Sequence, residues 1–537
     1  MRPSFSLALV ALACLARASG PTEPGVFVLG IDGMDPVILQ HLMDEGRMPH
    51  FQTLAHDGSF QPLGTSNPPQ SPVAWSTFVT GMYPGGHGIF DFVHRDPKTH
   101  HPISSATPPV DTDVATLRFF GYVIPLGSTD VPNNRGGVPW WDVLEDHGVD
   151  VEVYRMPGNF PTPPSKAKVL DGMGTVDLRG GYGTYTLYTD RAVEKDKPKG
   201  DIQLVSLQDL DLDGTPETAR GILRGPPDAF HLEPGQVPND SQYITLGVTL
   251  HVDASSVAVE VGDQVAVLAE GDWSDWIPVS FDALPHGLLS VAGTVRFFAK
   301  SLHPLEIYAS PVNISPDDPP VAIATPDEFV EDVFHATGFF YTKGMPEETD
   351  ALKDGVFSDD DYVRQVGLVQ KDSRAMLDLA LDRFAPGDTT FVYLSDIDLQ
   401  CHMLWRHGDP KYADAPPHPA YDPNVGPAHA QDIERFYEAT DAALGRVLER
   451  VPSGTLVIVM SDHGFQPYRR KVHLNSWLRD HGYLVLKDGK RTGSIPLDDV
   501  DWSKTRAYGI GFNGLYLNLA GRETGGIVDT ASAPALM

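Results

Sequence analysis

The chain has 537 residues, of which 41% are hydrophobic and 21% charged, and its formal net charge at pH 7 is −32. This length exceeds one ordinary hydrophobic core, so we expect two domains or one large domain with an insertion. The acidity argues against a nucleic acid polymer or an anionic lipid surface as partner, because phosphate binding needs clustered Lys and Arg.

The N-terminus has the form of a secretory signal peptide. A basic start is followed by the apolar stretch "LALVALACLA" and by Ala-Arg-Ala before Ser19. This predicts a signal peptide over residues 1–18 and export to the periplasm or the extracellular space. A short membrane anchor is one alternative, and lipid attachment at Cys14 is a less favoured one, because "ALAC" fits that pattern poorly. Elsewhere no run approaches the roughly 20 apolar residues of a span, so we expect no stable membrane span.

Apolar runs and helical patterns alternate towards both ends of the chain. "GVFVLGID" (25–32) predicts a buried parallel strand. Much later, Ser358 caps a predicted helix, and the strands "TTFVYLSDID" (389–398) and "TLVIVMSDHG" (455–464) flank a helix over 431–450. This alternation predicts an α/β fold with a mostly parallel central sheet flanked by helices.

The middle of the chain has a different pattern. Between residues 201 and 322, short β-type runs such as "YITLGVTLHV" and "SSVAVEV" are separated by Gly, Asp and Pro turns. They predict an all-β, sandwich-like insertion that divides the α/β catalytic core into a first part, 24–200, and a second part, 323–537. We expect the insertion to overhang the catalytic pocket and help select the substrate. The chain ends soon after a predicted strand, so we expect the second part to be incomplete at the C-terminus.

Three separated segments each end an apolar run with residues that can bind a metal. They are Asp32 in "LGIDGMD", Asp398 and His402 in "SDIDLQCH", and Asp462 and His463 in "MSDHGF". A single Asp after a strand is often only a helix cap or a turn residue. Three such segments at predicted carboxyl ends of strands, where open α/β sheets bind ligands, indicate a shared site. Carboxylates and imidazoles suit zinc, with manganese or iron as alternatives, and there are enough ligands for two ions.

Ser71 lies in "NPPQSPVAWSTF", directly before a predicted helix. A serine hydroxyl becomes nucleophilic when a base takes its proton or a metal binds its alkoxide. At a helix N-terminus it would also lie where the helix dipole and free N–H groups favour a phosphoryl group. The spacing leaves two interpretations open, a nucleophile and a simple helix cap.

Five stretches of the chain are informative in combination: "VFVLGIDGMDP", "RMPHFQTLAHDGSF", "SPVAWSTFVTGMYPGGHGIFDF", "SDIDLQCHMLWR" and "SDHGFQPYRRKVHLNSWLRDHGYL". In sequence and in order they resemble the alkaline phosphatase superfamily, specifically its type I phosphodiesterase and nucleotide pyrophosphatase branch. The resemblance implies an alkaline-phosphatase-like fold. It also implies a hydrolase of small-molecule phosphate esters or nucleotides that forms a covalent phospho-Ser71 intermediate at a site with two divalent ions, Zn²⁺ or Mn²⁺.

The resemblance also implies two sets of metal ligands. The positions that match the family around one metal, with Ser71 as the nucleophile, are Asp32, Ser71, Asp462 and His463. Asp398 and His402 match the other metal, which normally takes one more histidine. His473 in "RRKVHLNSWL" is the candidate for that third ligand, although related enzymes often place this histidine further along the chain.

Several nearby residues have structural interpretations instead. We expect Asp35 and Asp396 to be helix caps or supporting groups, His87 to be structural, and Cys401 to be a small buried filler beside the metal. Cys401 is followed by His and Met, unlike the nucleophile motif of the sulfatase branch, so conversion to formylglycine is not expected.

The sequence leaves other functions open. A phosphomonoesterase or a phosphoglycerate-mutase-like phosphotransferase would share the metal architecture. A noncatalytic exported metal-binding protein would result if an essential ligand were missing. The oligomeric state, the metals and the natural substrate are not predicted.

Overall fold

The structure is a computed structural model that describes residues 24–107, 115–119, 122–125, 132–193, 198–209, 217–233, 236–412, 414–493 and 497–537. The predicted signal peptide, residues 1–18, lies outside these residues, so export stays a prediction. Within the described part of the chain, no helix combines the length and the apolar character needed to cross a bilayer.

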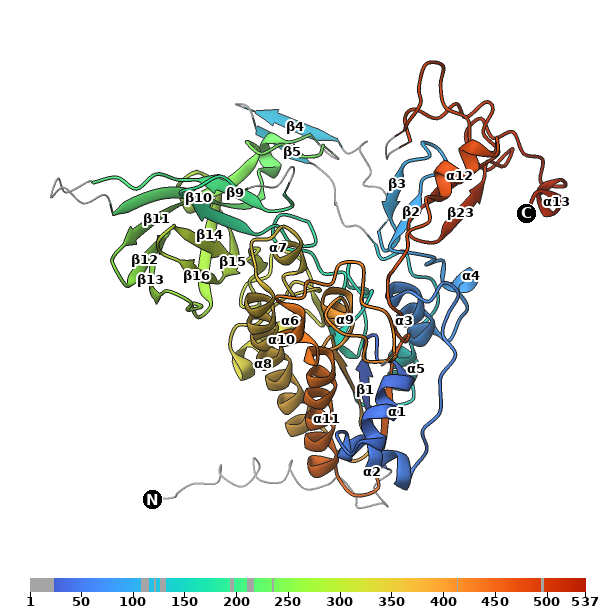
Figure 1. Ribbon diagram of the computed structural model, residues 1–537, viewed down its shortest axis with the longest axis horizontal. Coiled ribbons are helices and arrows are strands. Elements are labelled where there is room, and N and C mark those ends of the chain that lie inside the picture. The colour runs from blue at the N-terminus through green and yellow to red at the C-terminus, as the bar shows by residue number, and fades with distance from the viewer. Residues whose placement is uncertain are drawn as a thin grey trace, which may run out of the picture.

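A six-stranded sheet forms the centre of the α/β core. Its strand β1 is labelled among the surrounding helices in Figure 1. The strands of the sheet run in the order β19-β7-β6-β20-β1-β21, and every neighbouring pair is parallel except β19 with β7. The three predicted strands are adjacent here as β20, β1 and β21, which confirms the predicted α/β class. The strands are β1 (Val26–Ile31), β6 (Val151–Met156), β7 (Lys168–Asp171), β19 (Ala324–Thr325), β20 (Thr389–Leu394) and β21 (Leu456–Met460).

Helices cover both faces of this sheet. Along β1, Phe27 and Leu29 belong to a large hydrophobic cluster that includes residues of α1, α2, α8 and α11. Val28 belongs to a second cluster, with Trp75 of α3 and Trp141 of α5. Successive side chains of a strand point to opposite faces, so β1 is apolar throughout because both of its faces are covered.

The longer helices begin close to their predicted positions. Ser358 is the N-cap of α8, and its side chain and that of Asp361 form a reciprocal capping box. The helix predicted over 431–450 is α11. The helices of the core are α1 (Pro36–Asp44), α2 (Pro49–Asp57), α3 (Ser71–Thr80), α4 (Pro84–His87), α5 (Trp140–Asp146), α6 (Glu328–Thr337), α7 (Thr349–Lys353), α8 (Asp359–Arg383), α9 (Asp398–Leu404), α10 (Gly426–His429) and α11 (Asp432–Arg450).

Residues 201–314, here called the β-rich region, contain strands and two short 3₁₀ turns in their described part. The sheets have the orders β10-β11-β12-β13, β14-β15-β18 and β16-β17-β8-β9. The last sheet includes β8, which precedes residue 201, so the predicted domain boundary cuts through a sheet and stays a prediction. The strands are β8 (Thr186–Thr189), β9 (Asp201–Leu204), β10 (Thr218–Pro227), β11 (Tyr243–Val252), β12 (Ser256–Val261), β13 (Gln264–Ala269), β14 (Ile277–Leu284), β15 (Leu289–Val295), β16 (Phe297–Ser301), β17 (Glu306–Ala309) and β18 (Asn313–Ile314).

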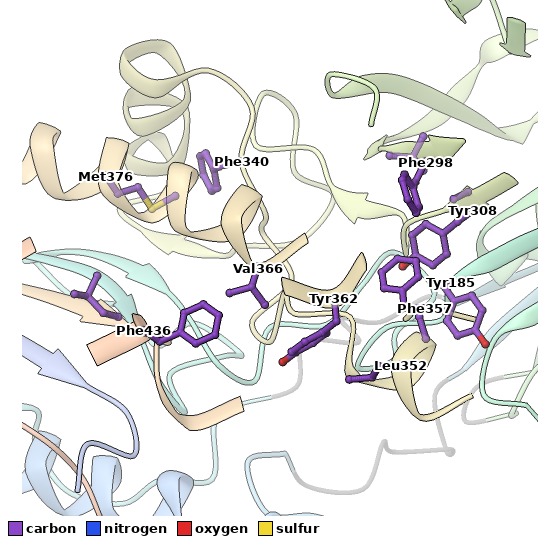
Figure 2. Packing of buried hydrophobic residues seen from close by; sticks show 14 of the residues in the cluster. Tyr185, Phe298, Tyr308, Phe340, Leu352, Phe357, Tyr362, Val366, Met376 and Phe436 are labelled. Atoms are coloured by element: carbon purple, nitrogen blue, oxygen red, sulfur yellow. The ribbon is translucent and has the colours of Figure 1, made fainter. Parts of the chain in front are cut away.

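The β-rich region and the α/β core share one hydrophobic cluster (Figure 2). Tyr308 of β17 packs against both Tyr185 and Phe357, with ring centroids 5.5 and 4.6 Å away. The cluster continues through Tyr362 into α8. Burial of this shared apolar surface holds the β-rich region against the core.

A smaller group of elements lies at the upper right of Figure 1 and has its own hydrophobic cluster, which includes Leu478, Leu484 and Tyr508. Its elements come from two parts of the chain, one after α4 and the other after residue 463. The elements outside the main sheets are β2 (Val93–Arg95), β3 (Pro102–Ser104), β4 (Thr116–Phe119), β5 (Tyr122–Pro125), α12 (Leu474–Asp480), β22 (Ala507–Ile510), β23 (Gly514–Leu517) and α13 (Ala533–Leu536).

Candidate functional site

The carboxyl ends of three adjacent parallel strands bring predicted ligands together. Asp32 follows β1, Asp398 begins α9 after β20, and His463 follows β21. One ligand atom from each of these three residues lies within 4.8 Å of the other two. Parallel strands end at the same edge of a sheet, which is why residues so far apart in the chain meet there.

Ser71 faces this cluster. It is the first residue of α3 and is only 6% exposed. Its Oγ donates to Asp32 Oδ1 at 3.3 Å and lies 3.1 Å from His463 Nε2. The N-cap position belongs to Gln70, and no side chain caps the helix. The interpretation of Ser71 as a helix cap is therefore wrong.

The N-terminus of α3 offers fewer free N–H groups than the sequence suggests. Pro72 has no N–H, and the N–H groups of Val73 and Ala74 both donate to the carbonyl of Gln70. An anion beside Ser71 would therefore depend on the dipole of α3 and on bound cations more than on backbone hydrogen bonds.

Asp462 completes a group of buried carboxylates. Its Oδ1 accepts a hydrogen bond from the Gly33 N–H at 3.2 Å, and its Oδ2 lies 3.4 Å from His463 Nε2. Asp462 Oδ2 and Asp398 Oδ1 are both buried without a hydrogen-bond partner. Buried oxygens without a donor are costly. Oxygen and imidazole donors with free lone pairs fit a divalent metal ion.

The carboxylates perturb one another. Burial raises the pKa of Asp398 well above its usual range, and the neighbouring Asp32 raises it further. Burial and Asp32 likewise raise the pKa of Asp462 to about 8. Burial lowers the pKa of His463, but Asp462, Asp32 and Asp398 outweigh burial and raise it to about 9. A bound cation would relieve this crowding of negative charge and displace the protons that otherwise neutralise it.

His402 and His473 lie outside this tight group. His402 stands one turn after Asp398 on α9, with its Nε2 3.5 Å from Asp398 Oδ2 and 55% of its side chain exposed. His473 is exposed just before α12, and the group of potential ligands found among the described residues does not contain it. The structure thus pairs His402 with Asp398 and does not group His473 with them.

Two buried aromatic residues contact Asp32 and were not predicted from the sequence. Tyr393, the penultimate residue of β20, donates its hydroxyl to Asp32 Oδ2 at 2.7 Å, and Trp75 Nε1 donates to the same oxygen at 3.1 Å. Burial and the charge of Asp32 raise the pKa of Tyr393 well above its usual range, so its hydroxyl keeps its proton and donates. In the sequence both side chains are typical of core packing, and no local pattern marks them.

Asp35 links the loops that carry the ligands. Its Oδ1 accepts the N–H groups of Val37 and Ile38 at the start of α1, as expected of a cap. Its Oδ2 accepts from the Phe465 N–H at 3.1 Å and from Lys411 Nζ at 2.8 Å. Asp35 therefore joins the loop after Asp32 to the loop after His463, and Lys411 is a buried contributor that no local sequence pattern marks.

Three other residues have structural contacts. The buried His87 lies with its Nε2 3.1 Å from Thr77 Oγ1. Asp396 pairs with Arg374, and Cys401 is 1% exposed. None of them belongs to the group of ligand atoms found among the described residues.

The comparison with known families separates the α/β core from most of the β-rich region. The model of the type I phosphodiesterase / nucleotide pyrophosphatase family matches residues 26–215 and 310–531. The interval between the two matched parts spans β10 to β17 of the β-rich region. Among curated proteins, none matches the chain. Because the family match covers more than half of the chain, including Ser71 and the three ligand segments, the chain belongs to the type I phosphodiesterase/nucleotide pyrophosphatase family, a branch of the alkaline phosphatase superfamily.

Proposed function

We propose that this protein is a metal-dependent phosphodiesterase or nucleotide pyrophosphatase in which Ser71 is the nucleophile. The observation that carries the proposal is the position of Ser71 Oγ, 3.3 Å from Asp32 Oδ1 and 3.1 Å from His463 Nε2. A hydroxyl among groups that can bind a cation is one that the cation can activate. Membership of the family supports hydrolysis of small-molecule phosphate esters or nucleotides.

Two sets of residues would hold divalent ions. Asp398 and His402 form one set, and His473, which is exposed and is not in the close group of three ligand atoms among the described residues, stays the candidate for its third ligand. The other set is Asp32, Ser71, Asp462 and His463. The close group of Asp32, Asp398 and His463 joins the two sets. Bound Zn²⁺ or Mn²⁺ would lower the pKa of a coordinated hydroxyl and stabilise the negative charge of the transferring phosphoryl group.

The chain's own groups define the two chemical steps. Ser71 Oγ attacks phosphorus, the bond to the leaving alcohol or phosphate breaks, and the Ser71 proton is taken up by solvent or by the leaving oxygen. Ser71 is then esterified to the phosphoryl group, which keeps its other substituent if the substrate is a diester. Water attacks that phosphorus, the bond to Oγ breaks, Ser71 regains a proton from the water, and phosphate or a phosphomonoester is released. Before the attack, Asp32 and His463 keep the Ser71 hydroxyl in one place, because both contact it in a site where Ser71 is 6% exposed.

The test compares Ser71→Ala with wild type on the diester bis-(p-nitrophenyl) phosphate and on the corresponding monoester, after chelation and reloading with zinc or manganese. Ser373→Ala is the matched control. Its Oγ is also buried in a helix, and it donates only to the carbonyl of Val369. We expect metal-restored diester hydrolysis in wild type and Ser373→Ala, and its loss in Ser71→Ala. Full activity in Ser71→Ala would overturn the assignment of the nucleophile.

The same assays separate the alternatives. A greater kcat/KM on the monoester would identify a phosphomonoesterase. Net transfer of phosphate between carbon positions, without free phosphate, would identify a mutase-like transferase. Metal bound stoichiometrically without turnover of either ester would favour a noncatalytic metal-binding protein.

We also propose that the protein is exported, on the evidence of its first 18 residues. N-terminal sequencing of the secreted or periplasmic protein should show a mature chain that starts at Ser19. A cytoplasmic chain that retains residue 1 would contradict export.

A further inference from the structure

The two oxygens of Asp32 have different neighbours. Oδ2 accepts hydrogen bonds from Tyr393 and Trp75, at 2.7 and 3.1 Å. Oδ1 faces the cluster, 3.3 Å from Ser71 Oγ and 3.6 Å from His463 Nε2. The Trp75 indole can only donate, so Oδ2 must accept. This division leaves Oδ1, which accepts from the Ser71 hydroxyl, as the oxygen that can meet a cation beside Ser71.

The surrounding core fixes both donors. Asp32, Trp75 and Tyr393 are 1, 0 and 4% exposed. The rings of Trp75 and Tyr393 meet edge to face, with centroids 5.7 Å apart. A Cβ at Gly30 of β1 would lie 2.5 Å from the Phe391 ring and 2.8 Å from the Trp75 ring, so the glycine makes room for both rings. The two donors cannot turn away from Asp32 without repacking the core.

Trp75 also links the carboxylate to the nucleophile. It lies four residues after Ser71 on α3, so the two side chains share one face of the helix. Tyr393 reaches Asp32 from β20, which pairs directly with β1 and places Tyr393 beside Gly30. The helix with the nucleophile and the central strand thus hold the same carboxylate oxygen.

We propose that Tyr393 and Trp75 are positioning residues that hold Asp32 with a single oxygen turned towards the metal and towards Ser71. The inference rests on the proposed metal-dependent function. Groups that hydrogen-bond a ligating carboxylate fix its orientation, and their loss typically costs about 10- to 100-fold in metal affinity or activity.

The test is the zinc affinity of the purified full-length chain, measured by competition with a chelating dye, for Tyr393→Phe and Trp75→Phe. Tyr188→Phe is the matched control, because it also removes a buried tyrosine hydroxyl, one that donates to the carbonyl of Ile222 in the β-rich region. We expect the dissociation constant for zinc to rise about 10-fold or more in Tyr393→Phe. In Tyr188→Phe it should change less than about 2-fold.

Zinc affinity in Tyr393→Phe equal to that of the control would overturn the positioning role, even if both variants melt at a lower temperature. Should Trp75→Phe fail to fold, Tyr393→Phe alone decides, since it removes one oxygen and keeps the ring. Asp32→Asn separates this inference from the proposed function. Weaker zinc binding in Asp32→Asn but not in Tyr393→Phe defeats only the positioning role, whereas unchanged binding in Asp32→Asn defeats both.

Discussion

The α/β core and the β-rich region place their polar groups in opposite ways. In the core, the parallel strands β1 and β20 are buried on both faces and β21 is a partly exposed edge strand, and the loops after them carry the largely buried carboxylates Asp32, Asp398 and Asp462. In the β10–β13 sheet, side chains alternate instead, so that Val248 and Leu250 are buried while Thr249 and its partner Glu260 face outward. The family match includes the first arrangement and omits the second. Parallel strand ends concentrate chemistry, whereas the antiparallel sheets contribute packing.

The largest expected effect is the loss of activity in Asp462→Asn, which tests whether the strand ends of the core carry the chemistry. The amide keeps an oxygen to accept the Gly33 N–H but removes the buried anion beside His463. We expect kcat/KM on a phosphodiester to fall at least about 1,000-fold, beyond the 10- to 100-fold typical of groups that only support a ligand.

The metal-free form of Asp462→Asn should be no less stable than metal-free wild type. Burial and Asp32 oppose ionisation of Asp462 and raise its pKa to about 8, so its charge costs stability when no metal is bound. Urea unfolding of the chelated proteins at pH 8 checks this. A marked loss of stability would mean that Asp462 is structural.

In the β-rich region, Phe281→Ala should lower stability and leave activity almost unchanged, which is the reverse of the result expected for Asp462→Asn. The ring is fully buried in β14, and its removal should lower the free energy of unfolding by about 3–5 kcal/mol. We expect kcat per folded molecule to stay within about 2-fold of wild type, because Phe281 is not among the groups that form the cluster of ligands. Denaturant titration and active-site-normalised kinetics measure the two quantities. A large fall in kcat with little loss of stability would give the β-rich region a catalytic role.

The ligand segments could be predicted because the signal is local. Each of Asp32, Asp398 and His463 follows an apolar run, and parallel strands end at a common edge. His473 shows the limit of that argument. It follows no strand, so nothing in its neighbourhood specified where its loop would lie, and the structure leaves it exposed.

Residues that act through another residue were not predictable. Tyr393 and Trp75 are typical core aromatics in the sequence, and their role depends on where a third residue, Asp32, lies after folding. Lys411 is a single cation in a polar loop, although it is buried against Asp35. The pairing of β8 with β17 was missed for a related reason, because 116 residues of chain separate the two strands and local alternation does not specify partners.

Two glycines, one beside the ligand cluster and one in the β-rich region, allow a matched comparison with smaller expected effects. Gly33 and Gly262 both have positive φ, 68° and 59°. A Cβ at Gly33 would lie 2.9 Å from Asp398, whereas a Cβ at Gly262, in the β12–β13 turn, would meet nothing within 4 Å. Gly262→Ala should cost about 1 kcal/mol of stability from backbone strain alone. Gly33→Ala should cost more and also weaken zinc binding, because it pushes Asp398 away from Asp32.

Thermal melts with and without zinc distinguish the two glycine variants. We expect the increase in melting temperature on adding zinc to shrink in Gly33→Ala and to match wild type in Gly262→Ala. Equal zinc-induced shifts in both variants would mean that the approach of Gly33 to Asp398 does not govern metal binding.

The last prediction concerns Asp171, a buried carboxylate that ends β7 on the same sheet but outside the ligand cluster. Burial raises its pKa from 3.8 to about 7, despite hydrogen bonds from Thr162 and Asn159. The folded state therefore holds a proton that the unfolded state releases, and this contribution to stability is lost as the pH rises from about 4 to 7.

Asp171→Asn cannot ionise and keeps both hydrogen-bonding positions. Relative to wild type, the variant should be more stable at pH 8 than at pH 5, as measured by urea unfolding. The same difference in unfolding free energy at both pH values would show that Asp171 titrates normally. Burial at a strand end of this sheet would then not be enough to raise the pKa of a carboxylate, and the like charges of the ligand cluster would be needed as well.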